Sequence, residues 1–387
     1  MVSREITPVV RERLATFPAV AIVGARQVGK TTLAREIAGS ENYYDLELAE
    51  ERTRLDVQWE QVSKAPNPVV LDEAQAFAEV FPRLRATIDD DRGRKGRFLI
   101  LGSISPSLMR RVSESLAGRI ALCELKPFSL AEVGADRLDE LWLWGGYPDG
   151  GVLGDETGPQ WAANYLDLLA MRDLPDWGLP AKPAMTKRMF AMLAAIHGGV
   201  WNASGIGRSL GLSYHTINSY LDYLEQAFLV RRVPAWSANI KKRLVKSPKI
   251  YWRDSGLLHA LLRVRDFDSL LIHPRVGNDF EGFVIEQTLA RLENLGIALD
   301  GPYFLRTSDG KEIDLVIGVG SRLLAVEVKL SSAPDVGDLR RLEAAAGLIG
   351  ADVCALVSRT VRPAYSDTAW SCDLSGFLDR LADLAGK

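Results

Sequence analysis

Gly24-Ala-Arg-Gln-Val-Gly-Lys-Thr31 matches the phosphate-loop pattern G-x-x-x-x-G-K-[ST] at every fixed position. The apolar run 19–23 before it predicts a buried strand, and the pattern of residues 32–38 after it predicts a helix. In a strand-loop-helix unit, backbone N–H groups and the helix N-terminus converge on an anion. The stretch therefore predicts a nucleoside triphosphate site.

Each part of this loop has an expected role. Lys30 should reach the β- and γ-phosphates, and the Thr31 hydroxyl should bind Mg²⁺. The cofactors expected are therefore ATP and Mg²⁺. The loop residues expected to contact the nucleotide are Gly24, Arg26, Gln27, Val28, Gly29, Lys30, Thr31 and Thr32.

A P-loop also needs an acid at the end of a neighbouring strand, and Pro68-Val-Val-Leu-Asp-Glu73 supplies two. Asp72 would organise the Mg²⁺ ion, and Glu73 would orient or deprotonate the attacking water. The next predicted strand, 97–101, is followed by Ser103, which would contact the γ-phosphate or cap the following helix. Arg119 is a candidate arginine finger, in cis or in trans, or a surface arginine.

Length and composition indicate an ordinary globular protein. A chain of 387 residues predicts two or three domains, and no stretch reaches the ~18 apolar residues of a membrane helix. Cys123, Cys354 and Cys372 have neither metal-site spacing nor an even count. We therefore expect a reducing, cytoplasmic location and no membrane partner.

The ordered motifs resemble a widespread prokaryotic AAA-type ATPase family with a C-terminal region of unknown function. The resemblance is carried by the P-loop, Leu71-Asp-Glu73, Leu101-Gly-Ser103, Leu116-Ala-Gly-Arg119 and Pro127-Phe-Ser129, and it continues to the Glu-Val-Lys at 327–329. It implies an α/β fold with an AAA/RecA-like P-loop NTPase domain built on a parallel sheet.

The middle of the chain predicts a helix-turn-helix. A short helix would end at Gly211, and a second would begin with Ser213 as N-cap. On this reading Tyr214, His215, Asn218 and Ser219 face outward from the recognition helix.

Residues 228–253 then predict a β-hairpin wing, which completes a winged helix. Its cations occur without an intervening acid: Arg231, Arg232, Lys241, Lys242, Arg243, Lys246, Lys249 and Arg253. Such a run suits a phosphate backbone, so DNA is the expected partner. The alternative is a winged helix used for domain packing or dimerisation.

The C-terminal third predicts a helix from Asp279, a strand at 303–306 and a hairpin, 312–317 and 323–330. Asp314, Glu327 and Lys329 would lie on adjacent strands, with Glu327 and Lys329 on one face. Two carboxylates and a lysine that converge can bind a divalent cation and activate water.

Asp followed by Glu-x-Lys resembles the PD-(D/E)XK nuclease fold, which implies a ligand from the first helix. Glu281 matches that position, with Glu286 as second choice, and the metal would be Mg²⁺ or Mn²⁺. The motif's leading Pro is replaced by Ile313. Because members of this fold also bind DNA without cutting it or serve as structural modules, cleavage is left open.

Together these patterns predict an ATPase domain (1–135), a helical linker with a winged helix (136–265) and a nuclease-like domain (266–387). The expected function is ATP hydrolysis coupled to work on DNA. The alternative is a nucleotide-gated regulatory or interaction protein with a silent nuclease-like domain. A protein partner, and an oligomer formed through an arginine finger in trans, are compatible with either.

Overall fold

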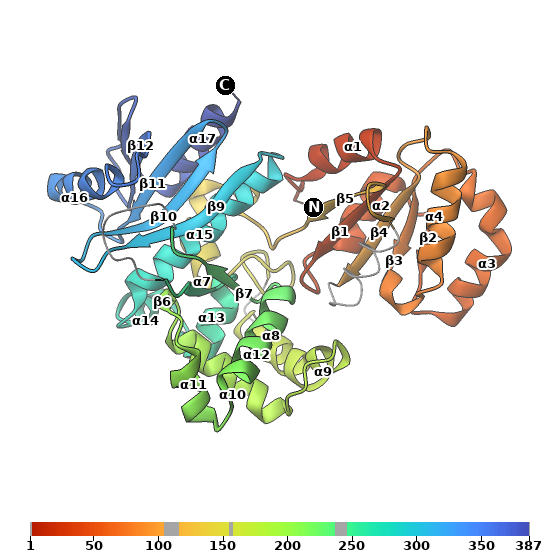
Figure 1. The fold of residues 1–387 in the computed structure, drawn as a ribbon, viewed down its shortest axis with the longest axis horizontal. Coiled ribbons are helices and arrows are strands. Elements are labelled where there is room, and N and C mark those ends of the chain that lie inside the picture. The colour runs from red at the N-terminus through yellow and green to blue at the C-terminus, as the bar shows by residue number, and fades with distance from the viewer. Residues whose placement is uncertain (1, 104–115, 155–157, 237–245, 387) are drawn as a thin grey trace.

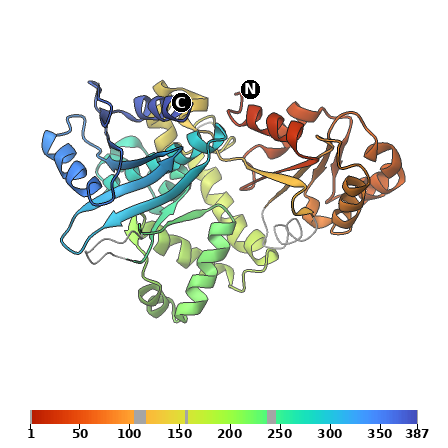
Figure 2. The same cartoon turned by 45° about the horizontal axis from the view of Figure 1, so that its top comes forward.

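A computed structural model describes residues 2–103, 116–154, 158–236 and 246–386 (Figure 1). The N-terminal and C-terminal domains lie at opposite ends, and the helices of the middle domain lie below and between them. The same arrangement is visible after a 45° turn (Figure 2). None of the described helices is both long and apolar enough to cross a membrane.

The N-terminal domain is built on a five-stranded parallel sheet in the order β2-β3-β4-β1-β5. Every residue of β1 and β3 is buried, as expected for parallel strands covered on both faces. The strands are β1 (Ala19–Gly24), β2 (Tyr43–Asp45), β3 (Val69–Asp72), β4 (Phe98–Ser103) and β5 (Ile120–Glu124). The helices are α1 (Thr7–Thr16), α2 (Lys30–Ala38), α3 (Ala49–Ser63), η1 (Ala74–Ala76) and α4 (Val80–Asp90).

The middle domain contains the predicted helix pair, α11 (Ala203–Leu210) and α12 (Tyr214–Gln226). Both predicted boundaries are confirmed: Gly211 ends α11 with a φ of 68°, and the Ser213 hydroxyl accepts a bond from the Thr216 N–H at 3.1 Å. A three-stranded antiparallel sheet, β6-β8-β7, completes the unit. Its strands are β6 (Gly199–Val200), β7 (Val230–Val233) and β8 (Lys249–Trp252).

The chain between β5 and the C-terminal domain contains further helices. They are α6 (Leu130–Val133), η2 (Ala135–Arg137), α7 (Leu138–Trp144), α8 (Gly158–Leu168), η3 (Leu169–Asp173), α9 (Leu174–Asp176), α10 (Pro183–Ala195), α13 (Ser255–Leu262) and α14 (Phe267–Leu271).

The C-terminal domain has a six-stranded mixed sheet in the order β13-β14-β12-β11-β10-β9. The predicted hairpin is confirmed, with Val316 of β10 opposite Ala325 of β11. The strands are β9 (Leu299–Arg306), β10 (Glu312–Val319), β11 (Arg322–Val328), β12 (Val353–Val357), β13 (Ala364–Tyr365) and β14 (Ala369–Cys372). The helices are α15 (Val276–Asn294), α16 (Val336–Ala346) and α17 (Leu374–Ala385).

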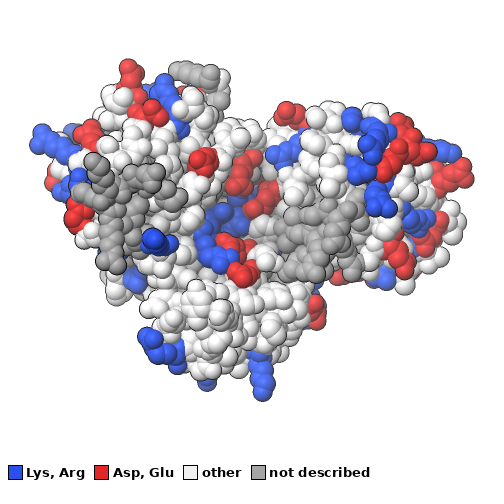
Figure 3. All heavy atoms as spheres, in the orientation of Figure 1, with Lys and Arg blue, Asp and Glu red and all other residues white. Residues whose placement is uncertain are grey.

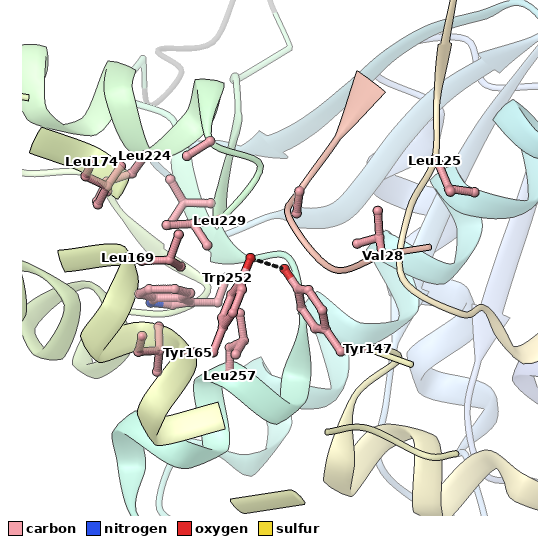
Figure 4. Packing of buried hydrophobic residues seen from close by; sticks show 14 of the residues in the cluster. Val28, Leu125, Tyr147, Tyr165, Leu169, Leu174, Leu224, Leu229, Trp252 and Leu257 are labelled. Carbon is pink, nitrogen blue, oxygen red and sulfur yellow. Dashed lines mark hydrogen bonds between the residues drawn. The ribbon is translucent and has the colours of Figure 1, made fainter. Parts of the chain in front are cut away.

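The apolar core is continuous from the phosphate loop into the middle domain. Val28 and Leu125 belong to the same buried cluster as Tyr147, Tyr165 and Trp252 (Figure 4). The Tyr147 and Tyr165 hydroxyls lie 3.4 Å apart within it. The phosphate loop is therefore packed against the middle domain as well as against its own sheet.

Candidate functional site

The phosphate loop has the predicted strand-loop-helix geometry, because β1 ends at Gly24 and α2 begins at Lys30. Two glycines make the wrap possible. A Cβ on Gly24 would lie 2.2 Å from the carbonyl oxygen of Leu125, so no side chain fits there. Gly29 caps α2 with a φ of 96°, a left-handed conformation that favours glycine.

Lys30 is held inside the loop. Its Nζ donates to the carbonyl oxygens of Gly24 (3.1 Å) and Ala25 (2.7 Å). Burial lowers the pKa of Lys30 to about 8, although Glu73 and Asp72 act to raise it. The ammonium therefore lies among carbonyl groups at a site where an anion would gain strongly from its charge.

The two acids predicted after β3 are next to the loop. The Thr31 hydroxyl and the Tyr43 hydroxyl each donate to Oδ2 of Asp72 at 2.7 Å, and the Glu73 N–H donates to Oδ1 at 2.9 Å. Glu73 has a φ of 47°, and burial raises the pKa of its carboxyl group. A carboxylate with a raised pKa beside the phosphate loop is suited to accept a proton from water.

A cleft of about 640 Å³ opens at the phosphate loop, and its far wall comes from the middle domain. Arg172 on that wall is a residue that sequence reasoning missed, because nothing in its local sequence relates it to the loop. Asp173 ties the two walls together: its Oδ1 lies 2.6 Å from Nη1 of Arg26 and 3.0 Å from Nε of Arg172. The cleft is lined by Arg26, Gln27, Gly29, Lys30, Thr31, Thr32, Glu47, Glu73, Pro148, Asp149, Arg172 and Asp176.

The C-terminal acids also come together. Asp314 influences both of its predicted partners, because it adds to burial in raising the pKa of Glu281 to about 8 and that of Glu327 to about 7. Lys329 Nζ lies 2.6 Å from Oε1 of Glu327, as expected for residues on one face. The predicted grouping of these four side chains is therefore present.

A lysine from another domain lies among these acids. Lys249 Nζ is 2.8 Å from Oε1 of Glu281, 3.0 Å from Oε1 of Glu312 and 3.5 Å from Oδ1 of Asp314. Among the described residues, no group of three or more His, Cys, Asp or Glu side chains has the arrangement of a metal site. The predicted metal role of Glu281, Asp314 and Glu327 is therefore not supported, because an ammonium group lies between two of these acids.

Comparison with known proteins assigns the N-terminal third of the chain. Residues 16–134 match an AAA domain, residues 135–268 a domain of unknown function (DUF8612), and residues 276–372 another (DUF4143). Uncharacterized proteins of Mycobacterium tuberculosis (Rv2008c) and Mycobacterium bovis (Mb2031c) are each 38% identical over 336 residues, which is 86% of this chain and 75% of theirs. The chain belongs to the same family as these mycobacterial proteins.

Two more distant similarities accompany this match. An uncharacterized protein of Haemophilus influenzae is 24% identical over 67% of this chain and 64% of its own. The Walker-type ATPase PABY2304 of Pyrococcus abyssi superposes with a TM-score of 0.40 at 16% identity, over 67% of this chain and 95% of that one. The AAA domain and the phosphate loop make this chain a P-loop ATPase of the AAA type.

Arg119, a predicted contributor to the nucleotide site, lies differently from expectation. Arg119 directly precedes β5 and so lies at the N-terminal ends of the parallel strands, whereas the phosphate loop follows the C-terminal end of β1; its side chain donates to both oxygens of Asp89 at 2.9 Å. The prediction that it acts in cis is therefore wrong, whereas a role in trans stays a prediction. Ser103 ends β4 in register with Gly24, but its side chain lies outside the described part of the chain.

The prediction that the wing cations are available for a phosphate backbone is wrong for most of those that the structure describes. Arg231 and Arg253 bind Glu286, Arg253 also binds Glu124, and Arg232 binds Glu225 and Asp222. The wing sequence itself does not reveal these pairs, because two of the four acids are distant in sequence and all four lie outside the wing. Glu286, the second choice as a metal ligand, is likewise occupied by arginines. Lys246 is exposed, whereas Lys241, Lys242 and Arg243 lie outside the described residues.

Proposed function

We propose that this ATPase acts on DNA, which it contacts through the exposed face of α11 and α12. The observation that carries the proposal is the charge of residues 177–221, which contain Lys182, Lys187, Arg188 and Arg208 but no Asp or Glu. In a chain with a net charge of −3, an acid-free segment of this length favours a polyanionic partner. In Figure 3 the surface over α10, α11 and α12 is largely uncharged, with isolated Lys and Arg.

The α11–α12 unit is suited to this role as a winged helix. Its element order, α10–β6–α11–α12–β7–β8, is that of such a domain, and Tyr214, His215 and Ser219 are exposed on α12. Asn218 is instead half-buried, and its Oδ1 accepts a bond from Trp201 Nε1 at 2.8 Å. Three of the four predicted outward residues therefore remain available for groove contacts.

Phosphate contacts would come from cations beside these helices rather than from most of the predicted wing. Lys246 lines a groove of about 460 Å³ with Tyr214 and Asn218, and Arg208 is exposed on α11. Helix N-termini at Ala203 and Tyr214 open near the same groove and would add N–H donors for phosphate oxygens.

At the nucleotide site, each residue has a proposed role. Lys30 would contact the β- and γ-phosphates, Glu73 would orient and deprotonate water, and Arg172 would face the γ-phosphate across the cleft. Mg²⁺ fits Thr31 and Asp72, since their oxygens already lie 2.7 Å apart beside the loop. When bound, the ion supplies positive charge to the phosphates during transfer.

The nucleotide state can reach the other domains through buried ion pairs. Arg253, directly after β8, contacts Glu124 at the end of β5 and Glu286 of α15. One side chain therefore joins the ATPase sheet, the middle domain and the C-terminal domain. In Figure 3, Lys, Arg, Asp and Glu side chains lie side by side in the hollow where these domains meet.

We further propose that the C-terminal domain is a PD-(D/E)XK-like module. Its elements follow the order α15–β9–β10–β11–α16–β12, and Asp314, Glu327 and Lys329 occupy the motif positions on the hairpin. A divalent cation does not fit beside Lys249, so we derive no cleavage step. This observation favours the second candidate function, a nucleotide-gated protein whose nuclease-like domain is catalytically silent.

ATP turnover measured with duplex, branched and single-stranded DNA tests the DNA proposal. We expect at least one DNA form to change the rate. In fluorescence anisotropy, the Arg208→Ala/Lys246→Ala double variant should bind DNA more weakly, and the slope of log K against log salt should fall by about two. Arg92→Ala/Lys95→Ala, which removes the same charges from the ATPase domain, is the matched control. Unchanged turnover with every DNA, together with intact binding by the double variant, would overturn the proposal.

A further inference from the structure

Lys249 of β8 reaches out of the middle domain into the acid cluster of the C-terminal domain. The residue is 3% exposed, and its Nζ faces oxygens of Glu281, Glu312 and Asp314 at 2.8, 3.0 and 3.5 Å. An ammonium group has three N–H donors and no acceptor, so three carboxylate oxygens around it match its bonding capacity. The cluster therefore already contains a cation, and that cation belongs to the chain.

Two aromatic side chains, Tyr251 and Phe304, also lie at this contact. Tyr251, two residues along the strand and hence on the same face, donates its hydroxyl hydrogen to Oε1 of Glu281. The same carboxylate oxygen thus accepts from both side chains. The Phe304 ring centroid lies 5.5 Å from Lys249 Nζ, within the range of a cation–π contact.

A divalent cation would need the same oxygens. Mg²⁺ or Ca²⁺ requires carboxylate oxygens at roughly 2.0–2.6 Å, converging on the volume that the Lys249 ammonium fills. Bringing a second positive ion next to a buried ammonium would also meet strong repulsion in a low-dielectric interior. The cluster can therefore hold either the Lys249 ammonium or a divalent cation, but not both.

We propose that Lys249 is the resident cation of the C-terminal acid cluster, and that it fastens β8 to this domain and excludes divalent metals. This deepens the proposed nuclease-like assignment and does not depend on DNA binding. The cluster becomes a divalent-metal site only when Lys249 is removed or β8 is withdrawn. The contact is thus an internal lock between the middle and C-terminal domains.

Mn²⁺ binding to the full chain, followed by electron paramagnetic resonance without nucleotide, tests the lock. Asp314→Asn identifies the cluster, since binding at the phosphate loop is unaffected by it. In wild type we expect no Mn²⁺ binding that Asp314→Asn removes. In Lys249→Ala we expect one additional Mn²⁺ ion per chain. Its affinity for the acid cluster should be at least tenfold higher than that of the wild-type cluster, and the site should be lost in Lys249→Ala/Asp314→Asn.

Two outcomes would overturn the proposal. The first is a wild-type Mn²⁺ site that Asp314→Asn abolishes while Asp300→Asn, at an exposed position of β9, does not. The second is a folded Lys249→Ala protein with no additional site. Circular dichroism and ATP turnover report whether Lys249→Ala is folded. If it is not folded, Lys249→Met, which preserves the aliphatic volume, replaces it. If neither variant folds, the comparison of Mn²⁺ binding between wild type and Asp314→Asn tests the proposal. None of these readouts involves DNA, so failure here is distinct from failure of the DNA proposal.

Discussion

The Thr31 hydroxyl donates a hydrogen bond of 2.7 Å to Oδ2 of Asp72, which joins the start of α2 to the end of β3. Helix α2 follows β1, and β4 separates β1 from β3 in the sheet. The proximity of the two oxygens brings the Glu73 carboxyl, one residue further on, to the wall of the nucleotide cleft. The geometry thus fits the proposed division of roles, in which Asp72 would hold Mg²⁺ with Thr31 and Glu73 would act on water.

Glu73→Gln should retain nucleotide binding and lose hydrolysis. The amide preserves the size of the side chain but cannot accept a proton, so we expect turnover to fall roughly 10²- to 10⁴-fold. Phosphate release measures the rate, and a fluorescent nucleotide measures the affinity. Glu36→Gln, on the exposed side of α2, is the control and should leave both unchanged. A Glu73→Gln variant that hydrolyses ATP at the wild-type rate would move the base elsewhere.

The affinity for ATP should depend on pH through Lys30. Burial lowers the pKa of Lys30 to about 8, so the free protein loses this charge as pH rises through 8. Phosphate binding requires the charged form, and we expect the Kd to be constant below about pH 7 and to rise up to tenfold per pH unit above 8. Calorimetric titrations between pH 6.5 and 9.5 provide the measurement. A Kd that is flat across this range would show that Lys30 stays charged in the free protein.

Arg172 and Arg119 should differ in their effect on catalysis. Arg172 lines the cleft, whereas Arg119 is hydrogen-bonded to Asp89 at the opposite end of the parallel strands. We expect Arg172→Ala to lower kcat by roughly a hundredfold, the usual cost of losing a donor to transition-state charge. Arg119→Ala should stay within about twofold of wild type in dilute protein. A decrease in kcat of Arg119→Ala relative to wild type that grows with protein concentration would instead reveal an arginine finger acting in trans.

The sequence was sufficient for the parts of the fold and site that are local. The strand, loop and helix around Lys30 follow one another in the chain, and the helix caps at Gly211 and Ser213 depend on residues within one turn. Such features are visible in periodicity and spacing. The hairpin of Asp314 and Glu327 is likewise a contact between neighbouring strands.

Ion pairs between domains could not be predicted from the sequence. Arg253 finds its acids 129 and 33 residues away, and Lys249 finds Glu281 32 residues away across a domain boundary. A run of cations predicts an exposed basic surface when no acidic partner lies in the same stretch of sequence. Lys249 is buried, and Arg231 and Arg253 are largely buried, beside acids that lie outside the wing sequence. One sequence does not reveal such burial for a charged residue.

Glu286→Gln should strongly destabilise the chain. The Glu286 carboxylate lies 3.0 Å from Nη2 of Arg231 and 3.3 Å from Nε of Arg253, and it is almost fully buried. Removing its charge leaves two largely buried guanidinium groups without this partner, a change that costs about 3–5 kcal/mol. Urea unfolding at pH 7 measures the loss. Glu140→Gln, in an exposed pair with Arg137, should leave the midpoint nearly unchanged.

The same pairs should set the acid limit of the fold. Burial acts to raise the pKa values of Glu124 and Glu286, but the neighbouring arginines outweigh it, and the pKa of Glu124 falls to about 2. Groups whose folded pKa lies below the unfolded value stabilise the protein above pH ~4.3, and this stability is lost as pH falls through the folded pKa. We therefore expect the free energy of unfolding to decline from pH 4.5 toward 2, and the decline to be shallower in Glu286→Gln. Equal slopes in the two proteins would mean that Glu286 titrates alike in the folded and unfolded chain.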